Sequence, residues 1–142
     1  MRRRQRRPAF TLVEIMIVVI IIGVLAAIVI PQLAGRTEQA RVSAAKAQIQ
    51  IFCDATDLFH ADNGFYPSNT QGLEALVTKP SNAQTWHQGG YLRASKVPLD
   101  PWKHEYVYRY PGINGIYDVI CYGADGRPGG TGYDQDMDNH GE

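Results

Sequence analysis

Residues 8–31 read PAFTLVEIMIVVIIIGVLAAIVIP, and this stretch decides how the chain is organised. Residues 15–30 are sixteen consecutive uncharged and mostly aliphatic residues. Counting from Phe10 lengthens the apolar run to twenty-one residues with a single interruption, Glu14. A helix of that length rises about 30 Å, which is enough to cross the hydrocarbon core of a bilayer. We therefore predict a transmembrane helix over residues 10–30.

The flanking charges predict the orientation of this helix. Five of the fourteen Lys and Arg residues lie in the first seven positions, directly before the apolar run. Basic flanks stay in the cytoplasm, so the C-terminal part of the chain is expected on the other side of the membrane, which the helix crosses as a single pass. A cleaved secretory signal would also start this way, but no polar region with a small-x-small site closes the run. The Arg-Arg pairs could suggest a twin-arginine signal, but the sequence lacks the rest of that motif. A plain transmembrane anchor would explain the apolar residues and the arginines, but not Glu14.

Glu14 is the informative residue of the apolar run. An ionisable side chain inside a membrane costs about 2–3 kcal/mol or more, so it usually has a partner. Nothing later in the run can pair with it. A cut between Ala9 and Phe10 would give each copy a new α-amino group, and the amine of a neighbouring copy would be a natural cation for Glu14. We therefore assign Glu14 to assembly.

The string RRPAFTLVEIMIVVIIIGVLAAIVIP resembles the class III signal of type IV pilins and pseudopilins. In that family a prepilin peptidase cuts before the Phe of an FTLxE motif and methylates the new N-terminus. The resemblance implies that residues 1–9 are a basic leader, that Phe10 is the first mature residue, and that Glu14 is the acid of the motif. The family usually has Gly before the cut. Ala9 is small enough for the same site, so slower or normal processing is expected.

Beyond the apolar run, the sequence predicts that the helix continues to about residue 63. Pro31 is expected to kink or locally melt it by removing a hydrogen bond. Asn63-Gly64 predicts its C-terminal end. Apolar and Thr side chains at i, i+3, i+4 spacing form a seam expected to pack on the rest of the protein: Ile49, Phe52, Thr56 and Phe59.

Residues 64–142 are rich in turns and aromatic residues and predict a small head. Residues 71–80 predict a short helix, and residues 104–111 and 115–123 predict two strands joined by a turn. A head of about 80 residues is small, so the second half of the long helix must complete its core. The fold class is therefore α+β: a long N-terminal helix, residues 10–63, packed on a small antiparallel sheet.

The two cysteines, Cys53 and Cys121, lack CxxC spacing and cannot form a thiol zinc site on their own. In an oxidising compartment the sequence allows a disulfide between them. On a helix, however, Cys53 lies nearly opposite a stripe that we expect to face the core: Ala44, Ala47, Ile51, Ala55 and Leu58. We therefore predict two free thiols.

Residues 122–139 form an acidic loop with five glycines, one proline and four aspartates. One interpretation is a flexible solvated loop. The other is a calcium site, because Ca²⁺ takes six to eight carboxylate and carbonyl oxygens, which a glycine-rich loop can supply. The spacing is not that of an EF-hand, and no His or Cys lies in the loop to favour zinc.

Further strings, in order along the chain, resemble the major pseudopilins of type II secretion systems: QGLEALV, GGYL, PLDPW, YDV and YGADGRPGGTGYDQDMDN. The resemblance implies Ca²⁺ in the acidic loop, bound by Asp125, Asp134, Asp136 and the carbonyl of Tyr122, with Asp138 left as a solvated acid. The family usually has Gly after PLDPW, so Lys103 puts that turn in question.

The same resemblance implies a structural subunit of a periplasmic pseudopilus, which polymerises through its N-terminal helix to drive exoprotein export. The partners it implies are copies of itself, minor pseudopilins, prepilin peptidase, an inner-membrane assembly platform with its ATPase, and membrane lipid before assembly. Two alternatives remain open. A type IV pilin would favour a C-terminal loop bounded by a disulfide, and a membrane-tethered calcium-binding module would stay monomeric.

Charge and motif content argue against two other classes. Without the leader, nine basic residues stand against fourteen acidic ones, a balance of −5, so the basic face of a nucleic-acid-binding protein is not expected. The four histidines are scattered, and the sequence has no Ser-His-Asp or HExxH pattern. Carboxylates in an open glycine-rich loop are poorly placed for acid–base catalysis. We predict no nucleic-acid partner and no enzymatic activity.

Overall fold

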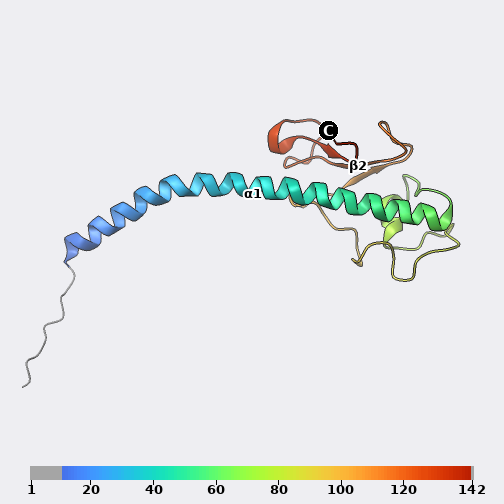
Figure 1. Ribbon diagram of the computed structural model, residues 1–142, viewed down its shortest axis with the longest axis horizontal. Helices are drawn as coiled ribbons and strands as arrows, with labels where there is room; N and C mark the ends of the chain where they lie inside the picture. The colour runs from blue at the N-terminus through green and yellow to red at the C-terminus, as the bar shows by residue number, and fades with distance from the viewer. Residues whose placement is uncertain (1–10, 142) are drawn as a thin grey trace, which may run out of the picture. The chain divides into compact units, whose positions relative to one another are not determined.

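The computed structural model describes residues 11–141, with the backbone alone for residues 30–34. The chain divides into two compact units, Met1–Thr37 and Glu38–Glu142. One helix, α1 (Leu12–Asn63), contributes to both units (Figure 1). The predicted long N-terminal helix is therefore confirmed, and the boundary between the units falls within it.

The part of α1 in the first unit is long and apolar enough to cross a membrane. Leu12–Val29 has a mean hydropathy of 3.2, and none of it is buried inside the protein. Its Leu, Ile, Val and Met side chains are all exposed in the isolated chain. Side chains of this kind are covered either by protein or by lipid, and a bilayer supplies such an apolar environment.

α1 continues through Pro31 without interruption. The local melting predicted at this residue is therefore wrong. A proline removes one backbone donor from the hydrogen-bond ladder of a helix. The hydrogen bonds of the turns on either side can hold the backbone helical despite that loss.

The second unit is built on the predicted seam of α1. Ile49, Phe52, Thr56 and Phe59 are each 3% exposed or less. Phe52 packs edge-to-face on Tyr106, with the ring centroids 4.9 Å apart. Aromatic pairs in this geometry stabilise a core beyond the effect of their buried area. The predicted end of the helix is also confirmed, since α1 stops at Asn63.

A three-stranded antiparallel sheet lies against this half of α1, with the order β1-β2-β3 (Figure 1). The strands are β1 (Val107–Arg109), β2 (Asp118–Cys121) and β3 (Met137–Asp138). β1 and β2 confirm the two predicted strands, although both are shorter than expected. β3 was not predicted, because two residues inside a Gly- and Asp-rich segment carry no strand periodicity. The short helix predicted over residues 71–80 is a 3₁₀-helix, η1 (Gly72–Leu76).

Both cysteines are free, as predicted, and both are buried, which was not predicted for Cys53. The helical argument behind that prediction is nevertheless wrong. Ile51 and Leu58, from the stripe expected to face the core, are each 51% exposed, whereas Cys53 is buried beside the aromatic seam. Burial raises the pKa of the Cys121 thiol to about 12, helped by the Asp100 carboxylate and opposed by the N–H of Gly123.

The turn that follows PLDPW forms around a buried carboxylate, Asp100. Its Oδ1 accepts the N–H groups of Trp102 at 2.9 Å and His104 at 2.8 Å, and its Oδ2 accepts the Cys121 thiol at 3.3 Å. Lys103 has φ 75°, the left-handed conformation that glycine adopts most easily. The turn therefore forms with lysine in place of glycine, held by the bonds to Asp100.

Candidate functional site

The N-terminal motif lies at the beginning of α1. Ala9 and Phe10, the predicted processing residues, lie outside the described residues. Thr11 caps the helix, because its Oγ1 accepts the N–H of Glu14 at 3.2 Å and its carbonyl accepts the N–H of Ile15 at 3.3 Å. Thr-x-x-Glu before an apolar run is a known capping pattern, so the residues TLVE were a readable sign of this cap that the sequence reasoning missed.

Glu14 is thus an exposed carboxylate in the first turn of α1. The partial positive charge at a helix N-terminus favours an acid at this position. That partial charge does not replace a cation in lipid, and the chain has no basic residue between Thr11 and Gly35. The full positive charge that would neutralise Glu14 must therefore come from outside this stretch of the helix.

The acidic loop follows β2, contains β3 near its end, and folds closely on itself. The N–H of Ala124 donates to the carbonyl of Tyr133 at 2.9 Å. A Cβ at Gly123 would lie 2.7 Å from the backbone of Asp134, and Gly130 has no room for one beside the same residue. Both glycines also have positive φ, 66° and 91°. Gly123 and Gly130 are therefore needed for the tight closure of the loop beside Asp134.

The predicted ligands occupy this loop but do not form one cluster. Asp125 accepts the N–H of Arg127 at 3.0 Å, and Asp136 Oδ2 accepts the N–H of Gly129 at 2.9 Å. Asp134 is exposed, and Tyr122 is half-buried. Across residues 11–141, no group of three or more His, Cys, Asp or Glu side chains is arranged to hold a metal ion.

One atom of the loop nevertheless points to a missing ligand. Asp136 Oδ1 is buried and accepts no hydrogen bond, which is costly for a carboxylate oxygen. Asp136 borders a hollow of about 240 Å³ that is also lined by Gly129, Gly130 and Asp138. A hard cation coordinated by carboxylate and carbonyl oxygens is the chemistry that suits such an atom. Of the predicted ligands, Asp136 alone lines this hollow, so its unpaired oxygen suits a cation while Asp125, Asp134 and Tyr122 lie elsewhere in the loop.

Asp138 has a structural role that the sequence did not indicate. Its Oδ1 accepts the N–H groups of His140 at 2.8 Å and Gly141 at 3.1 Å. Asp138 is also half-buried in β3. The expectation of a solvated acid is wrong here, because this carboxylate closes the C-terminal turn.

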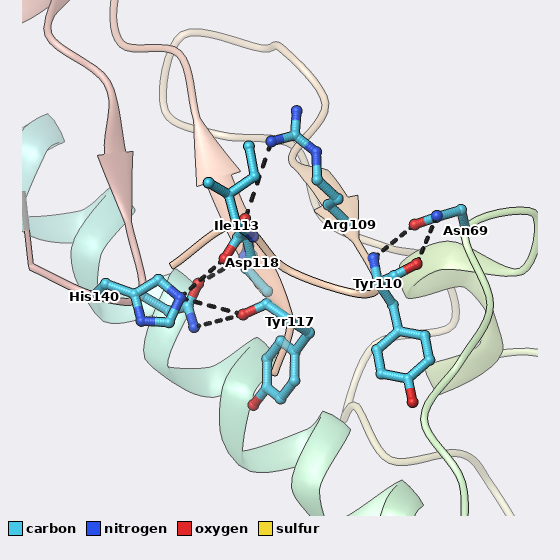
Figure 2. Close-up of polar contacts among 9 residues, drawn as sticks. Asn69, Arg109, Tyr110, Ile113, Tyr117, Asp118 and His140 are labelled. Carbon is cyan, nitrogen blue, oxygen red and sulfur yellow. Dashed lines mark hydrogen bonds and ion pairs between the residues drawn. The ribbon is translucent and has the colours of Figure 1, made fainter. Parts of the chain in front are cut away.

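A second buried carboxylate, Asp118, organises the turn between β1 and β2 (Figure 2). It is 2% exposed. Its Oδ2 accepts the N–H of Ile113 at 2.8 Å, its Oδ1 lies 3.0 Å from His140 Nε2, and Arg109 lies 4.0 Å away. Burial acts to raise the pKa of Asp118. The backbone donors of Ile113 and Asn114 and the His140 ring outweigh that effect and lower the pKa.

Amide side chains fix the same turn from two sides (Figure 2). Asn69 exchanges two hydrogen bonds of 2.7 Å with the backbone of Tyr110. Asn139 accepts the N–H of Val119 at 2.7 Å and donates to the carbonyl of Tyr117 at 3.2 Å. The sequence reasoning missed these residues, because their partners lie 20 to 41 positions away along the chain.

Comparison with known proteins places these features in a family. Residues 32–140 match the family model described as type II secretion system protein G, and residues 4–30 match the prokaryotic N-terminal methylation motif. The chain is 47% identical to the type II secretion system core protein G of Pseudomonas aeruginosa over 142 residues, covering 98% of each chain. It is 43% identical to that of Vibrio cholerae, covering 98% of this chain and 95% of the relative.

A solved structure has the same fold. The crystal structure of the major pseudopilin from the type 2 secretion system of enterohaemorrhagic Escherichia coli superposes with a TM-score of 0.64 at 31% identity. The match covers 77% of this chain and 94% of that chain.

Proposed function

Since this chain belongs to the type II secretion system protein G family, the major pseudopilins, we infer that it is a structural subunit of the pseudopilus of a type II secretion system. The match to the family model over residues 32–140 carries this conclusion. The family is structural, and we propose that the chain catalyses no reaction of its own. The type IV pilin alternative is set aside, because the family model and the curated relatives agree on type II secretion.

We propose that copies polymerise through α1. Its apolar half is exposed in the isolated chain, so it needs lipid before assembly and other helices afterwards. The carboxylate of Glu14 would then meet the α-amino group of Phe10 in a neighbouring copy. When two unlike surfaces of identical subunits bind each other, the rotation from one subunit to the next either closes into a ring or continues as an open helical filament.

The remaining partners follow from this role. We propose that the head lies in the periplasm and that residues 10–30 anchor the subunit in the inner membrane, with the basic leader in the cytoplasm. A prepilin peptidase would cut between Ala9 and Phe10. An assembly platform with its ATPase would add subunits to a fibre that also contains minor pseudopilins, and growth of the fibre would drive exoprotein export.

The test of this proposal is the chain produced together with its secretion components. Electron microscopy is expected to show fibres that contain the protein. The intact mass is expected to be that of residues 10–142 with one methyl group on the new N-terminus. A mature protein that retains residues 2–9, or a cell that makes the processed protein without fibres, contradicts the proposal.

We also propose that the acidic loop binds Ca²⁺ through Asp125, Asp134, Asp136 and the carbonyl of Tyr122. Four aspartates lie within fourteen residues and repel one another. The many glycines of the loop lose backbone entropy when it is ordered. A bound cation offsets both costs and gives the unpartnered Oδ1 of Asp136 a partner.

Calcium at one hundred times its Kd is expected to raise the melting temperature of residues 34–142 by about 10–20 °C relative to chelator. A ligand that binds only the folded state then adds about 2.7 kcal/mol of stability, and each kcal/mol raises the melting temperature of a small domain by about 4–8 °C. Asp136→Ala or Asp134→Ala should abolish the calcium-dependent part. Magnesium should substitute poorly, because it demands a tighter octahedron.

The matched control is Asp138→Ala. This change should lower stability with and without calcium, because Asp138 closes the C-terminal turn, but it should leave the difference between the two conditions intact. Equal melting of the parent protein with calcium and with chelator would make the loop a solvated connection.

A further inference from the structure

The head exposes few large apolar side chains, and four of them gather in two places. Ile113 and Ile116 lie in the turn between β1 and β2, and Ile51 and Leu58 lie on α1. Scattered exposed apolar residues are ordinary, but grouped ones mark sites of interaction. The two groups are therefore candidate contact sites for another protein surface.

The first group lies in a hydrogen-bonded turn, residues 111–116, and we call this turn with its two exposed isoleucines the hairpin knob. Ile113 is 74% exposed and Ile116 is 62% exposed, so Ile113 contributes little to the core of its own head. The N–H of Gly112 donates to the carbonyl of Ile116 at 3.0 Å, and the N–H of Ile113 donates to Asp118 (Figure 2). A surface that is already ordered loses little conformational entropy on binding.

The second group lines a hollow of about 690 Å³ between α1 and the segment 91–98, which we call the helix groove. Most of its lining is apolar: Ile51, Ala55, Leu58, Leu92, Ala94 and Pro98. In Figure 1 the sheet that carries the hairpin knob and the segment that borders the groove lie on opposite sides of α1. The hairpin knob and the helix groove are thus two separate surfaces of the head.

We propose that the hairpin knob of one copy inserts into the helix groove of the next copy. The inference rests on the proposed function, since a fibre of identical subunits supplies both surfaces in every copy. A convex apolar surface and a concave one on opposite sides of α1 form the unlike pair that an open filament requires. Asp54, exposed at the groove, is the counter-charge that the partly exposed Arg109 beside the knob would meet, while Arg93 also lines the groove.

Cysteine crosslinking in assembled fibres tests this contact. The full chain carrying Ile113→Cys and Leu58→Cys is expressed with its secretion components and treated with a short bifunctional maleimide. A ladder of covalent dimers, trimers and larger species is expected on a denaturing gel. Each single variant should stay monomeric, because the knob meets the groove and not another knob. Cys53 and Cys121 are buried, so the parent chain should also remain monomeric.

Two further arms keep the outcome clear. Ile116→Cys with Leu58→Cys should also give a ladder, whereas Tyr133→Cys with Leu58→Cys places an exposed cysteine outside the knob and should not. Fibres without a ladder from either knob pair overturn the contact and leave the proposed function standing. A dimer from Ile113→Cys alone also overturns it, since that indicates a knob-to-knob contact. Absence of fibres from the parent chain contradicts the proposed function itself.

Discussion

Replacing Asp118 with alanine is expected to lower the free energy of unfolding of residues 34–142 by about 1–3 kcal/mol, the cost of leaving a hydrogen-bond donor of the buried carboxylate unpaired. The change leaves the N–H of Ile113 without its acceptor and Arg109 without its counter-charge, and it leaves the His140 ring only the more distant carbonyl of Tyr117, at 3.3 Å. Each buried donor that loses its partner costs about 1–3 kcal/mol. Chemical denaturation at neutral pH measures the loss. Asp54→Ala, at an exposed position on α1, is the matched control and should stay within about 0.5 kcal/mol of the parent.

The same residue should govern part of the acid sensitivity of the head. Because the pKa of Asp118 is lower in the folded state, the unfolded chain binds a proton more readily. The stabilising contribution is therefore complete above the unfolded value of about 3.9 and is lost as pH falls through the lower folded pKa. Asp118→Asn keeps an acceptor for Ile113 but cannot titrate, so its unfolding free energy should fall less steeply below about pH 4. Parallel pH profiles for the parent and Asp118→Asn would refute this account.

Replacing Glu14 with alanine should abolish fibre assembly while leaving membrane insertion intact. Removal of a carboxylate from an apolar run makes insertion easier, so any defect must arise later, when a subunit docks onto the fibre. The docking step is expected to fail because the amine of the neighbouring copy then lacks its counter-charge in lipid. Electron microscopy gives the fibre yield, and membrane fractionation gives the inserted amount.

Two neighbouring changes separate charge from packing. Glu14→Asp keeps the carboxylate and should restore part of the assembly, whereas Ile15→Ala removes apolar volume from the same turn and should assemble. A normal rate and yield of fibres from Glu14→Ala would exclude the ion pair.

The features of this chain that the sequence predicted are those with local patterns. The length of α1, its seam of Ile49, Phe52, Thr56 and Phe59, and the β1–β2 hairpin all follow from periodicity within a few residues. The identity of the membrane segment follows equally from an unbroken apolar run. The acidic loop could be located from composition alone, but its ligands could not be shown to converge.

The features that escaped prediction depend on contacts between distant parts of the chain. Asp100 and Asp118 look like ordinary acids in the sequence, and only the folded chain brings Cys121 to one and His140 to the other. Cys53 illustrates a different error. Both faces of α1 carry regularly spaced apolar residues, and periodicity alone did not decide which face the head covers. The head covers the face of α1 with the aromatic seam, because Phe52 and Phe59 bury far more apolar area than the alanines of the other stripe.

The two buried thiols have a consequence for the biogenesis of the subunit. Burial raises the pKa of Cys53 as well as that of Cys121, so neither carries much thiolate at neutral pH. Only the thiolate attacks disulfides or reacts with oxidants, and protection of this kind makes such exchange slow. Once folded, the head is therefore expected to keep both thiols reduced in an oxidising compartment, and its core needs no disulfide between them.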